Sequence, residues 1–238
     1  RLKASLHNVT PEVIRAQVSW LKRHFDVVPL DALVADYRPG LAAVTFDDGY
    51  RSALTEGAEA LDDLGVHSTH FLTCGTLMGK GTFWRDKLHA VIGAGLAGAF
   101  AARLAAATGT AIDAGMDADT VYRRSKSPEV DSRMADRELD AFLAEHGLGS
   151  EAGPVVTDPA DLPDSPLLAY GNHTRSHYVL ASLPPEAQRA EIRACRELLE
   201  GLGLPLSRVL SLPFGEAKDV DADTFAAARA EGYAAVAF

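Results

Sequence analysis

Short apolar strand patterns alternate with amphipathic helix patterns over most of this 238-residue chain. Strand-like segments occur at 27–30, 41–46, 66–73, 167–171, 208–212 and from 234 onward. Between them, helix-like segments cover 10–25, 54–64, 184–200 and 221–231. Such alternation is typical of a parallel α/β sheet or barrel, because parallel strands need helical crossovers. We therefore predict an α/β fold.

The region from about 80 to 165 departs from this alternation. It is alanine-rich with charge clusters, and then rich in proline, aspartate and glycine from 147 to 166. We predict two or more helices and a long loop there, as an insertion or lid on a single domain that spans 1–238.

Composition excludes some classes of protein. The net charge of −10 argues against nucleic acid as a partner, because phosphate binding needs a basic face. The longest apolar run, 90–107, is interrupted by glycines and Arg103, so we expect no membrane span. With no leader visible, we expect a cytoplasmic protein. Cys74 and Cys195 are expected to be small core residues rather than a disulfide.

Two adjacent carboxylates end the second strand pattern. Asp47 and Asp48 follow the apolar segment 41–46, and Gly49 allows a sharp turn after them. Without a cation between them, the two carboxylates would repel and the pKa of one would rise. A bound metal explains the pair best, so further ligands are expected elsewhere in the chain.

Two histidines follow the strand pattern at 167–171. His173 and His177 are four residues apart, and on a helical turn both imidazoles would face the same ion. Because parallel α/β folds gather their sites at the carboxyl ends of strands, we expect these histidines near Asp48. One carboxylate and two histidines leave open positions, which is typical of catalytic zinc. By contrast, His67 and His70 alternate on a strand and make a poor ligand pair.

Three motifs, in this order and spacing, resemble those of the polysaccharide deacetylases (carbohydrate esterase family four, the NodB homology domain). They are Thr-Phe-Asp-Asp-Gly at 45–49, His-Thr-x-x-His at 173–177 and Leu-Pro-Phe-Gly at 212–215. The resemblance implies a deformed (β/α)7 TIM-like barrel. It implies that Asp48, His173 and His177 hold a divalent metal, usually Zn²⁺, and that Asp47 is the general base. It also implies an oxyanion donor in the backbone N–H of Phe214.

The motifs depart from the family pattern in two places. Ser211 stands where family members often have an arginine that orients the base, so the partner of Asp47 is unassigned. No Leu-x-x-His segment, which carries the family's general acid, follows residue 215. We expect the chain to be trimmed at its ends.

The expected activity is metal-dependent hydrolysis of an acetyl or other acyl group from an N- or O-acetylated sugar or glycan. Tyr50, Tyr178 and Phe214 are candidate substrate-binding aromatics, with ordinary packing as the alternative for Tyr178. Two other functions stay open. One is hydrolysis of a small non-sugar amide or cyclic imide on the same scaffold. The other is a catalytically inactive carbohydrate-binding domain.

Overall fold

The structure is a computed structural model that describes residues 9–80, 82–113, 115–149 and 155–237. Over these residues the strands are β1 (Asp26–Val27), β2 (Leu41–Ala42), β3 (Val44–Phe46), β4 (Ser68–Leu72), β5 (Leu168–Asn172), β6 (Leu206–Ser211) and β7 (Ala235–Ala237). The α-helices are α1 (Pro11–His24), α2 (Leu30–Ala35), α3 (Ala58–Asp62), α4 (Trp84–Gly93), α5 (Ala97–Thr108), α6 (Ala118–Ser125), α7 (Ser132–Glu145), α8 (Pro185–Gly201) and α9 (Ala222–Ala230).

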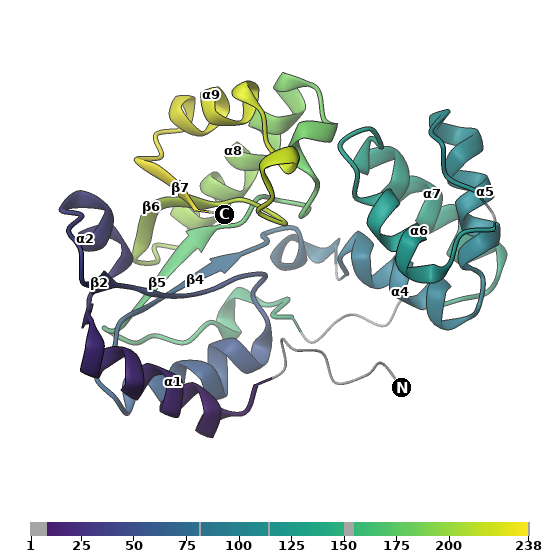
Figure 1. The fold of residues 1–238 in the computed structure, drawn as a ribbon. Helices are drawn as coiled ribbons and strands as arrows, with labels where there is room; N and C mark the ends of the chain where they lie inside the picture. The colour runs from purple at the N-terminus through teal and green to yellow at the C-terminus, as the bar shows by residue number, and fades with distance from the viewer. Residues whose placement is uncertain (1–8, 81, 114, 150–154, 238) are drawn as a thin grey trace.

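The main sheet confirms the predicted fold class. Its five strands are all parallel, in the order β3-β4-β5-β6-β7, and a separate parallel pair joins β1 to β2. The helices lie outside this curled sheet, with α1 and α3 toward one end and α8 and α9 toward the other (Figure 1). The fold is a deformed (β/α) barrel, and within the described residues it is an open half-barrel. All five strands of the main sheet end at the same edge.

Two predicted elements differ from the structure. The expected strand 41–46 is divided at Ala43, so that β2 pairs with β1 whereas β3 enters the main sheet. The expected helix 54–64 begins as a π-helical turn, Ala53–Gly57, and continues as α3. A continuous apolar run cannot reveal a change of sheet, since both halves are partly buried.

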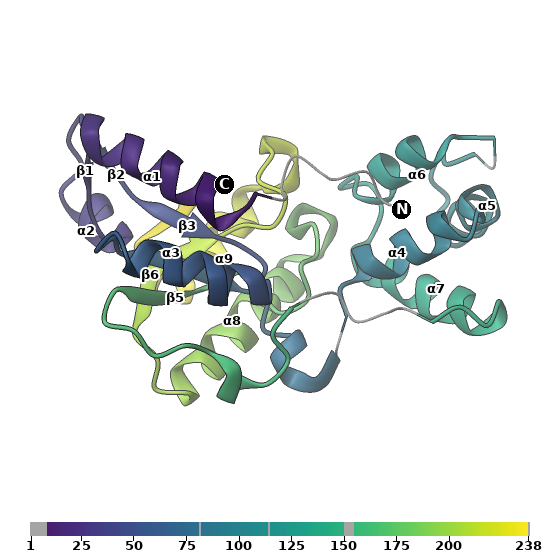
Figure 2. The same cartoon turned by 90° about the horizontal axis from the view of Figure 1, so that it is seen from below.

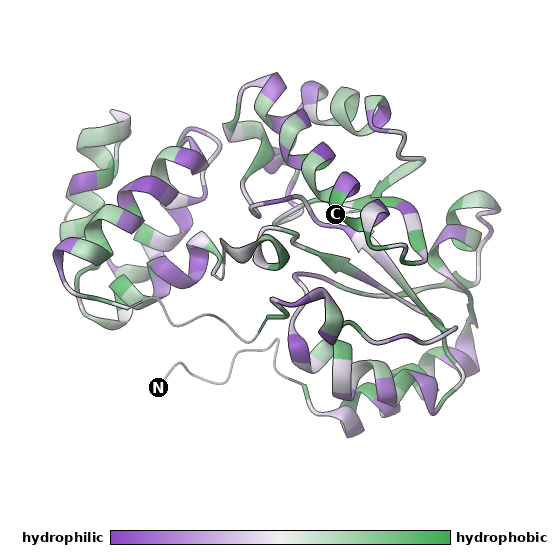
Figure 3. Cartoon of the chain, turned by 180° about the vertical axis from the view of Figure 1, so that it is seen from behind, coloured by the Kyte–Doolittle hydropathy of each residue, from purple (hydrophilic) through white to green (hydrophobic). Residues whose placement is uncertain are grey.

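The predicted insertion is a group of four helices, α4 to α7, which lies to one side of the sheet (Figures 1 and 2). Its apolar side chains share one buried cluster with the barrel. That cluster joins Trp84, Leu88 and Phe142 of the insertion to Leu210 and Leu212 beside β6. Colouring by hydropathy shows the apolar strands inside and polar residues on the outward helix faces (Figure 3). Burial in a common core thus fixes the insertion against the carboxyl edge of the sheet.

The prediction for the two cysteines is wrong. Cys74, after β4, and Cys195, on α8, are both buried and form a disulfide, with their Cα atoms 5.2 Å apart. They are 121 residues apart in sequence, so only the packing of α8 against the sheet brings them together. Disulfides persist mainly in oxidising compartments, and the bridge therefore does not favour the cytoplasmic location expected from the sequence.

No helix within the described segments has both the length and the apolar character needed to cross a bilayer.

Candidate metal centre and active site

The three predicted metal ligands meet at the carboxyl edge of the sheet. Asp48 follows β3 and His173 follows β5, while β4 lies between these two strands. Oδ1 of Asp48 lies 3.3 Å from Nε2 of His173 and 3.0 Å from Nε2 of His177. One ligand atom from each of the three residues lies within 4.8 Å of the others. The predicted cluster is therefore assembled by strand ends that are far apart in the sequence.

The loop that carries the histidines is not a helical turn, so that part of the prediction is wrong. Thr174 and His177 have φ values of 63° and 56°, in the left-handed region, and the segment between β5 and Leu180 is irregular. The backbone N–H of His177 donates to Oγ1 of Thr174 at 3.2 Å. This irregular turn, rather than helical spacing, directs both imidazoles toward Asp48.

Backbone strain concentrates at this site. Over the described residues, the non-glycine residues with positive φ are Asp48, Thr174, His177 and Phe214. Every one of them lies in a loop that carries a sequence motif. Left-handed backbone costs a non-glycine residue of order 1–3 kcal/mol, and it is retained where the surrounding structure fixes it, often at functional sites.

Two glycines let these loops approach the sheet. Gly49 has φ 80°, and a Cβ there would lie 3.1 Å from Cδ2 of Leu72. At Gly171 a Cβ would overlap the ring of Phe71. Gly171 lies directly before Asn172, whose Oδ1 accepts from the N–H of Thr174 at 2.7 Å and whose Nδ2 donates to the carbonyl of Ile192 at 2.8 Å. Asn172 thus shapes this turn through both ends of its side-chain amide.

The donor set of the cluster fits a divalent metal. Oδ1 of Asp48 is buried, and Nε2 of His173 and Nε2 of His177 both converge on this one oxygen. Nδ1 of His173 lies 3.0 Å from the carbonyl oxygen of Ser211, and donation there leaves Nε2 free as a ligand. Two imidazole nitrogens with one carboxylate are a set that Zn²⁺ commonly takes in catalytic sites.

Neighbouring charges prepare these groups for a cation. Burial opposes ionisation of Asp48, but the charge on His177 and the hydrogen bonds of both histidines hold the pKa of its carboxyl far below the usual range. Burial, aided by the charge of Arg85, lowers the pKa of His177 to about 4. Although burial acts against it, hydrogen bonding to Asp48 raises the pKa of His173. An ionised carboxylate therefore faces an imidazole that is neutral at pH 7.

Asp47 differs from Asp48 in exposure and in partner. Its side chain is exposed, and Oδ1 accepts a hydrogen bond from Oγ of Ser211 at 3.1 Å. The same serine supplies the carbonyl that contacts His173. Ser211 thus occupies the position of the family's arginine and contacts the same acid, an orienting partner that the sequence alone left unassigned.

The insertion supplies two contacts to the cluster that sequence reasoning missed. Nη2 of Arg85 donates to Oδ2 of Asp48 at 2.9 Å, and the Arg85 side chain is only 17 % exposed. The indole of Trp84 is buried and donates to the carbonyl of His177 at 2.9 Å. Neither contact has a local sequence signal, because Arg85 is 37 residues from Asp48 and Trp84 is 93 residues from His177.

The candidate substrate-binding aromatics lie in different environments. Tyr50 is half-buried, and burial together with the charge of Asp48 raises the pKa of its phenol. The ring of Phe214 packs edge-on against His177, with centroids 4.8 Å apart. Tyr178 is only 6 % exposed, and its hydroxyl donates to Asp136 at 2.6 Å. The packing alternative therefore describes Tyr178 better, whereas Tyr50 and Phe214 border the cluster.

His70 is a core histidine, whereas His67 is only partly buried. His70 is buried, its ring stacks on Phe46 with centroids 4.8 Å apart, and its Nε2 lies 3.1 Å from Oγ of Ser68. Burial lowers the pKa of His70 to about 4. A neutral histidine held in this way contributes to packing and takes no part in the metal cluster.

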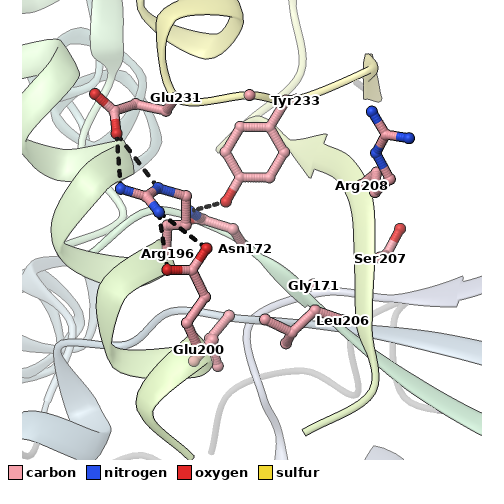
Figure 4. Close-up of a pocket in the computed structure, with 11 residues that line it drawn as sticks. Gly171, Asn172, Arg196, Glu200, Leu206, Ser207, Arg208, Glu231 and Tyr233 are labelled. Carbon is pink, nitrogen blue, oxygen red and sulfur yellow. Dashed lines mark hydrogen bonds and ion pairs between the residues drawn. The ribbon is translucent and has the colours of Figure 1, made fainter. Parts of the chain in front are cut away.

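A polar pocket of about 140 Å³ lies apart from the metal ligands, between α8 and the strands β5 and β6 (Figure 4). Its lining consists of Gly171, Asn172, Arg196, Leu199, Glu200, Leu206, Ser207, Arg208, Glu231, Gly232 and Tyr233. Arg196 pairs with Glu200 and Glu231, and the Tyr233 hydroxyl accepts from Asn172 at 2.6 Å. The polar groups of this pocket are thus largely paired with one another, and the hydroxyl of Tyr233 helps to hold Asn172, which precedes the histidine loop.

The chain thus combines a parallel α/β half-barrel with an Asp-His-His cluster at the carboxyl edge of its sheet. Residues 163–236 match the family model described as "Polysaccharide deacetylase", and this segment contains both histidines, Ser211 and Phe214. None of the curated proteins matches the chain.

Two solved structures share the fold. One is the Streptococcus pyogenes deacetylase PplD in complex with acetate, with a TM-score of 0.51 and 12 % identity, over 97 % of this chain and 73 % of that one. The other is IcaB from Ammonifex degensii, with a TM-score of 0.51 and 18 % identity, over 99 % of this chain and 78 % of that one. The polysaccharide deacetylase family, predicted from the sequence, is thus supported by a sequence model and, for the fold, by these structures.

Proposed function

We propose that this protein is a metal-dependent deacetylase that removes an acetyl group from an N- or O-acetylated sugar or glycan. One observation carries the proposal. A buried carboxylate oxygen and two imidazole nitrogens converge within 3.0–3.3 Å, while an exposed second carboxylate stands beside them without joining the cluster. A domain that only binds carbohydrate would need no base next to a metal. The presence of a second, exposed carboxylate beside the cluster therefore favours a catalytic function over an inactive carbohydrate-binding domain.

The residues divide the reaction between them. Asp48, His173 and His177 would hold the ion, which when bound lowers the pKa of water and polarises the acyl carbonyl. Asp47, oriented by Ser211, takes the proton of the attacking water. The backbone N–H of Phe214, held in the left-handed conformation with φ 69°, donates to the oxygen on which negative charge develops. The water oxygen ends on acetate, and its proton passes to the leaving amine or alcohol.

The substrate-binding role is assigned to Tyr50 and Phe214, which border the metal ligands. Their aromatic faces suit the apolar face of a sugar ring. Zn²⁺ is the ion we expect, since imidazole and carboxylate ligands with open positions are its usual catalytic set. A small non-sugar amide remains the alternative substrate, and the assay described next distinguishes it from a glycan.

The test combines metal content with acetate release from the acetylated compounds and with ring opening of a cyclic imide. Purified protein is offered acetylated mono- and oligosaccharides together with small N-acyl amides and a cyclic imide, with and without a chelator. We expect acetate release from the sugars that the chelator abolishes and added Zn²⁺ restores. In Asp48→Ala, elemental analysis is expected to find little metal. Release that ignores the chelator, or stoichiometric metal in Asp48→Ala, would refute the mechanism.

A further inference from the structure

The helical insertion brings two cationic side chains to the same aromatic ring. The guanidinium carbon of Arg85 lies 5.8 Å from the centroid of the Phe214 ring. The ammonium nitrogen of Lys126 lies 5.3 Å from that centroid. The Phe214 ring also packs against His177, with centroids 4.8 Å apart, so the same ring contacts both cations and a proposed metal ligand.

Lys126 is not engaged by a carboxylate. Within the segments that the structure describes, no acidic group lies at ion-pair distance from its ammonium, and its other close contact is the ring of Tyr122 at 5.3 Å. Lys87, on the same insertion, is instead held by Asp136 at 2.7 Å and Asp140 at 2.6 Å. Lys87 is thus held by two direct ion pairs, whereas Lys126 forms none among the described residues and interacts with Glu216 only through its charge.

Arg85 also retains donor capacity. Its Nη2 is committed to Asp48, but its Nε is buried and lacks a hydrogen-bond partner among the described residues. A guanidinium carries five N–H donors in a planar fork, so one bond to Asp48 leaves others for an acceptor. A buried unpaired donor is costly, and a bound anion would satisfy it.

A local explanation exists for each cation, but neither explains the pair. Lys126 caps the C-terminus of α6, where the helix dipole favours positive charge. Arg85 offsets the charge of Asp48. Glu216 forms its ion pair with Lys218, which lowers the pKa of its carboxyl, and the charge of Lys126 also helps to lower that pKa.

We propose that the substrate is an acylated sugar that bears an anionic group, a carboxylate or a phosphate, and that Arg85 and Lys126 bind this group across Phe214. The inference rests on the proposed function and narrows its substrate class. Arginine and lysine form short charge-assisted hydrogen bonds with carboxylate and phosphate oxygens. The insertion then selects the substrate, and the sheet edge supplies the chemistry.

The experiment compares matched substrates on the metal-loaded full chain. The anionic probes are N-acetylglucosamine 1-phosphate and N-acetylglucosaminuronic acid, and the neutral probe is methyl N-acetylglucosaminide. We expect kcat/KM to favour at least one anionic probe by about tenfold or more, equivalent to about 1.4 kcal/mol. This preference is expected to shrink in 0.5 M salt, which screens charge. The two anionic probes separate phosphate recognition from carboxylate recognition.

Lys126→Gln is the decisive variant. We expect it to lower the ratio of anionic to neutral kcat/KM by about tenfold. The matched control is Arg124→Gln, which removes one positive charge from an exposed position on the same helix and is expected to leave the ratio unchanged. An equal kcat/KM for all probes in the wild type, or an unchanged ratio in Lys126→Gln, would overturn the inference while the proposed deacetylase function stands.

A binding titration keeps the inference testable apart from turnover. The probes are titrated calorimetrically into the metal-loaded Asp47→Asn protein, with and without Lys126→Gln. Tighter binding of an anionic probe that depends on Lys126 supports the inference. This holds even if the wild-type protein releases acetate from none of the probes, a result that would count only against the proposed function. Equal binding of anionic and neutral probes overturns it.

Discussion

The carboxyl edge of the sheet and the helical insertion contribute to the site in different ways. The edge supplies Asp47, Asp48 and the two histidines from strand ends, and its loops contain the left-handed residues. The insertion is built of regular helices and contributes side chains that support or flank these groups, such as Trp84 and Arg85. Among the described residues, the non-glycine residues with left-handed backbone thus lie at the edge, and the insertion supports them with regular helices.

This comparison also separates what burial does in the two regions. At the edge, burial lowers the pKa of His177 and so favours the neutral imidazole that binds a metal, although it opposes ionisation of Asp48. In the insertion, burial joins apolar helix faces into the core shared with the barrel. Changes at the edge are therefore expected to affect catalysis or folding sharply, whereas comparable changes in the insertion are expected to be milder.

The largest expected effect is at the base. Asp47→Asn removes the group that accepts the proton of water, and general-base catalysis is typically worth 10²–10⁴-fold, so we expect kcat to fall by about that factor. Metal content, measured by elemental analysis, is expected to stay at the wild-type level because Asp47 is not a ligand. The control is Asp223→Asn, an exposed position on α9. Loss of metal in Asp47→Asn, or retention of full activity, would contradict the division of roles between the two aspartates.

A smaller effect is expected from a matched pair of glycine substitutions. In Gly171→Ala the new methyl would overlap the ring of Phe71, and overpacking of this kind costs about 1–3 kcal/mol of stability. In Gly93→Ala, at the end of α4, a Cβ meets nothing within 4 Å, and alanine suits a helix better, so stability is expected to rise by less than about 1 kcal/mol. Urea denaturation measures both values. Equal stability of the two variants would remove the contrast between edge and insertion.

The smallest effect concerns the residue that orients the base. Ser211→Ala removes the hydroxyl that donates to Asp47 but keeps the carbonyl that faces His173. A hydrogen bond of this kind is worth about 1 kcal/mol, so kcat is expected to fall by roughly 3–10-fold with metal content unchanged. The pH profile of kcat is the second readout, because a purely structural role would not move it. An unchanged kcat would show that Asp47 needs no partner.

Sequence reasoning succeeded where local pattern determines structure. The ends of strands β3 and β5 were expected to carry Asp48 and His173, and their convergence follows from parallel strands that share one edge. The histidine loop was predicted as a helical turn, because spacing alone does not show that Thr174 and His177 adopt the left-handed conformation. The types of the residues thus predicted the composition of the cluster, whereas their spacing did not predict the backbone conformation of the loop.

The remaining features depend on contacts between distant segments. The hydrogen bond from Ser211 to Asp47 joins residues 164 positions apart, and that from Arg85 to Asp48 joins residues 37 apart. These residues come into contact only when β6 and the insertion have taken their places in the folded domain. For the same reason the bond between Cys74 and Cys195 was not expected from two isolated cysteines.

That disulfide gives the chain a closed topology. The bridge ties residue 74 to residue 195, so every residue between them, including the whole insertion and both histidines, lies within one covalent ring. Asp48 lies outside that ring, and an ion bound by Asp48, His173 and His177 would link the inside of the ring to the outside. A single proteolytic cut in a loop of the insertion would therefore open the ring without releasing a fragment. The piece that carries Asp48 and the piece that carries the two histidines would stay joined by the disulfide.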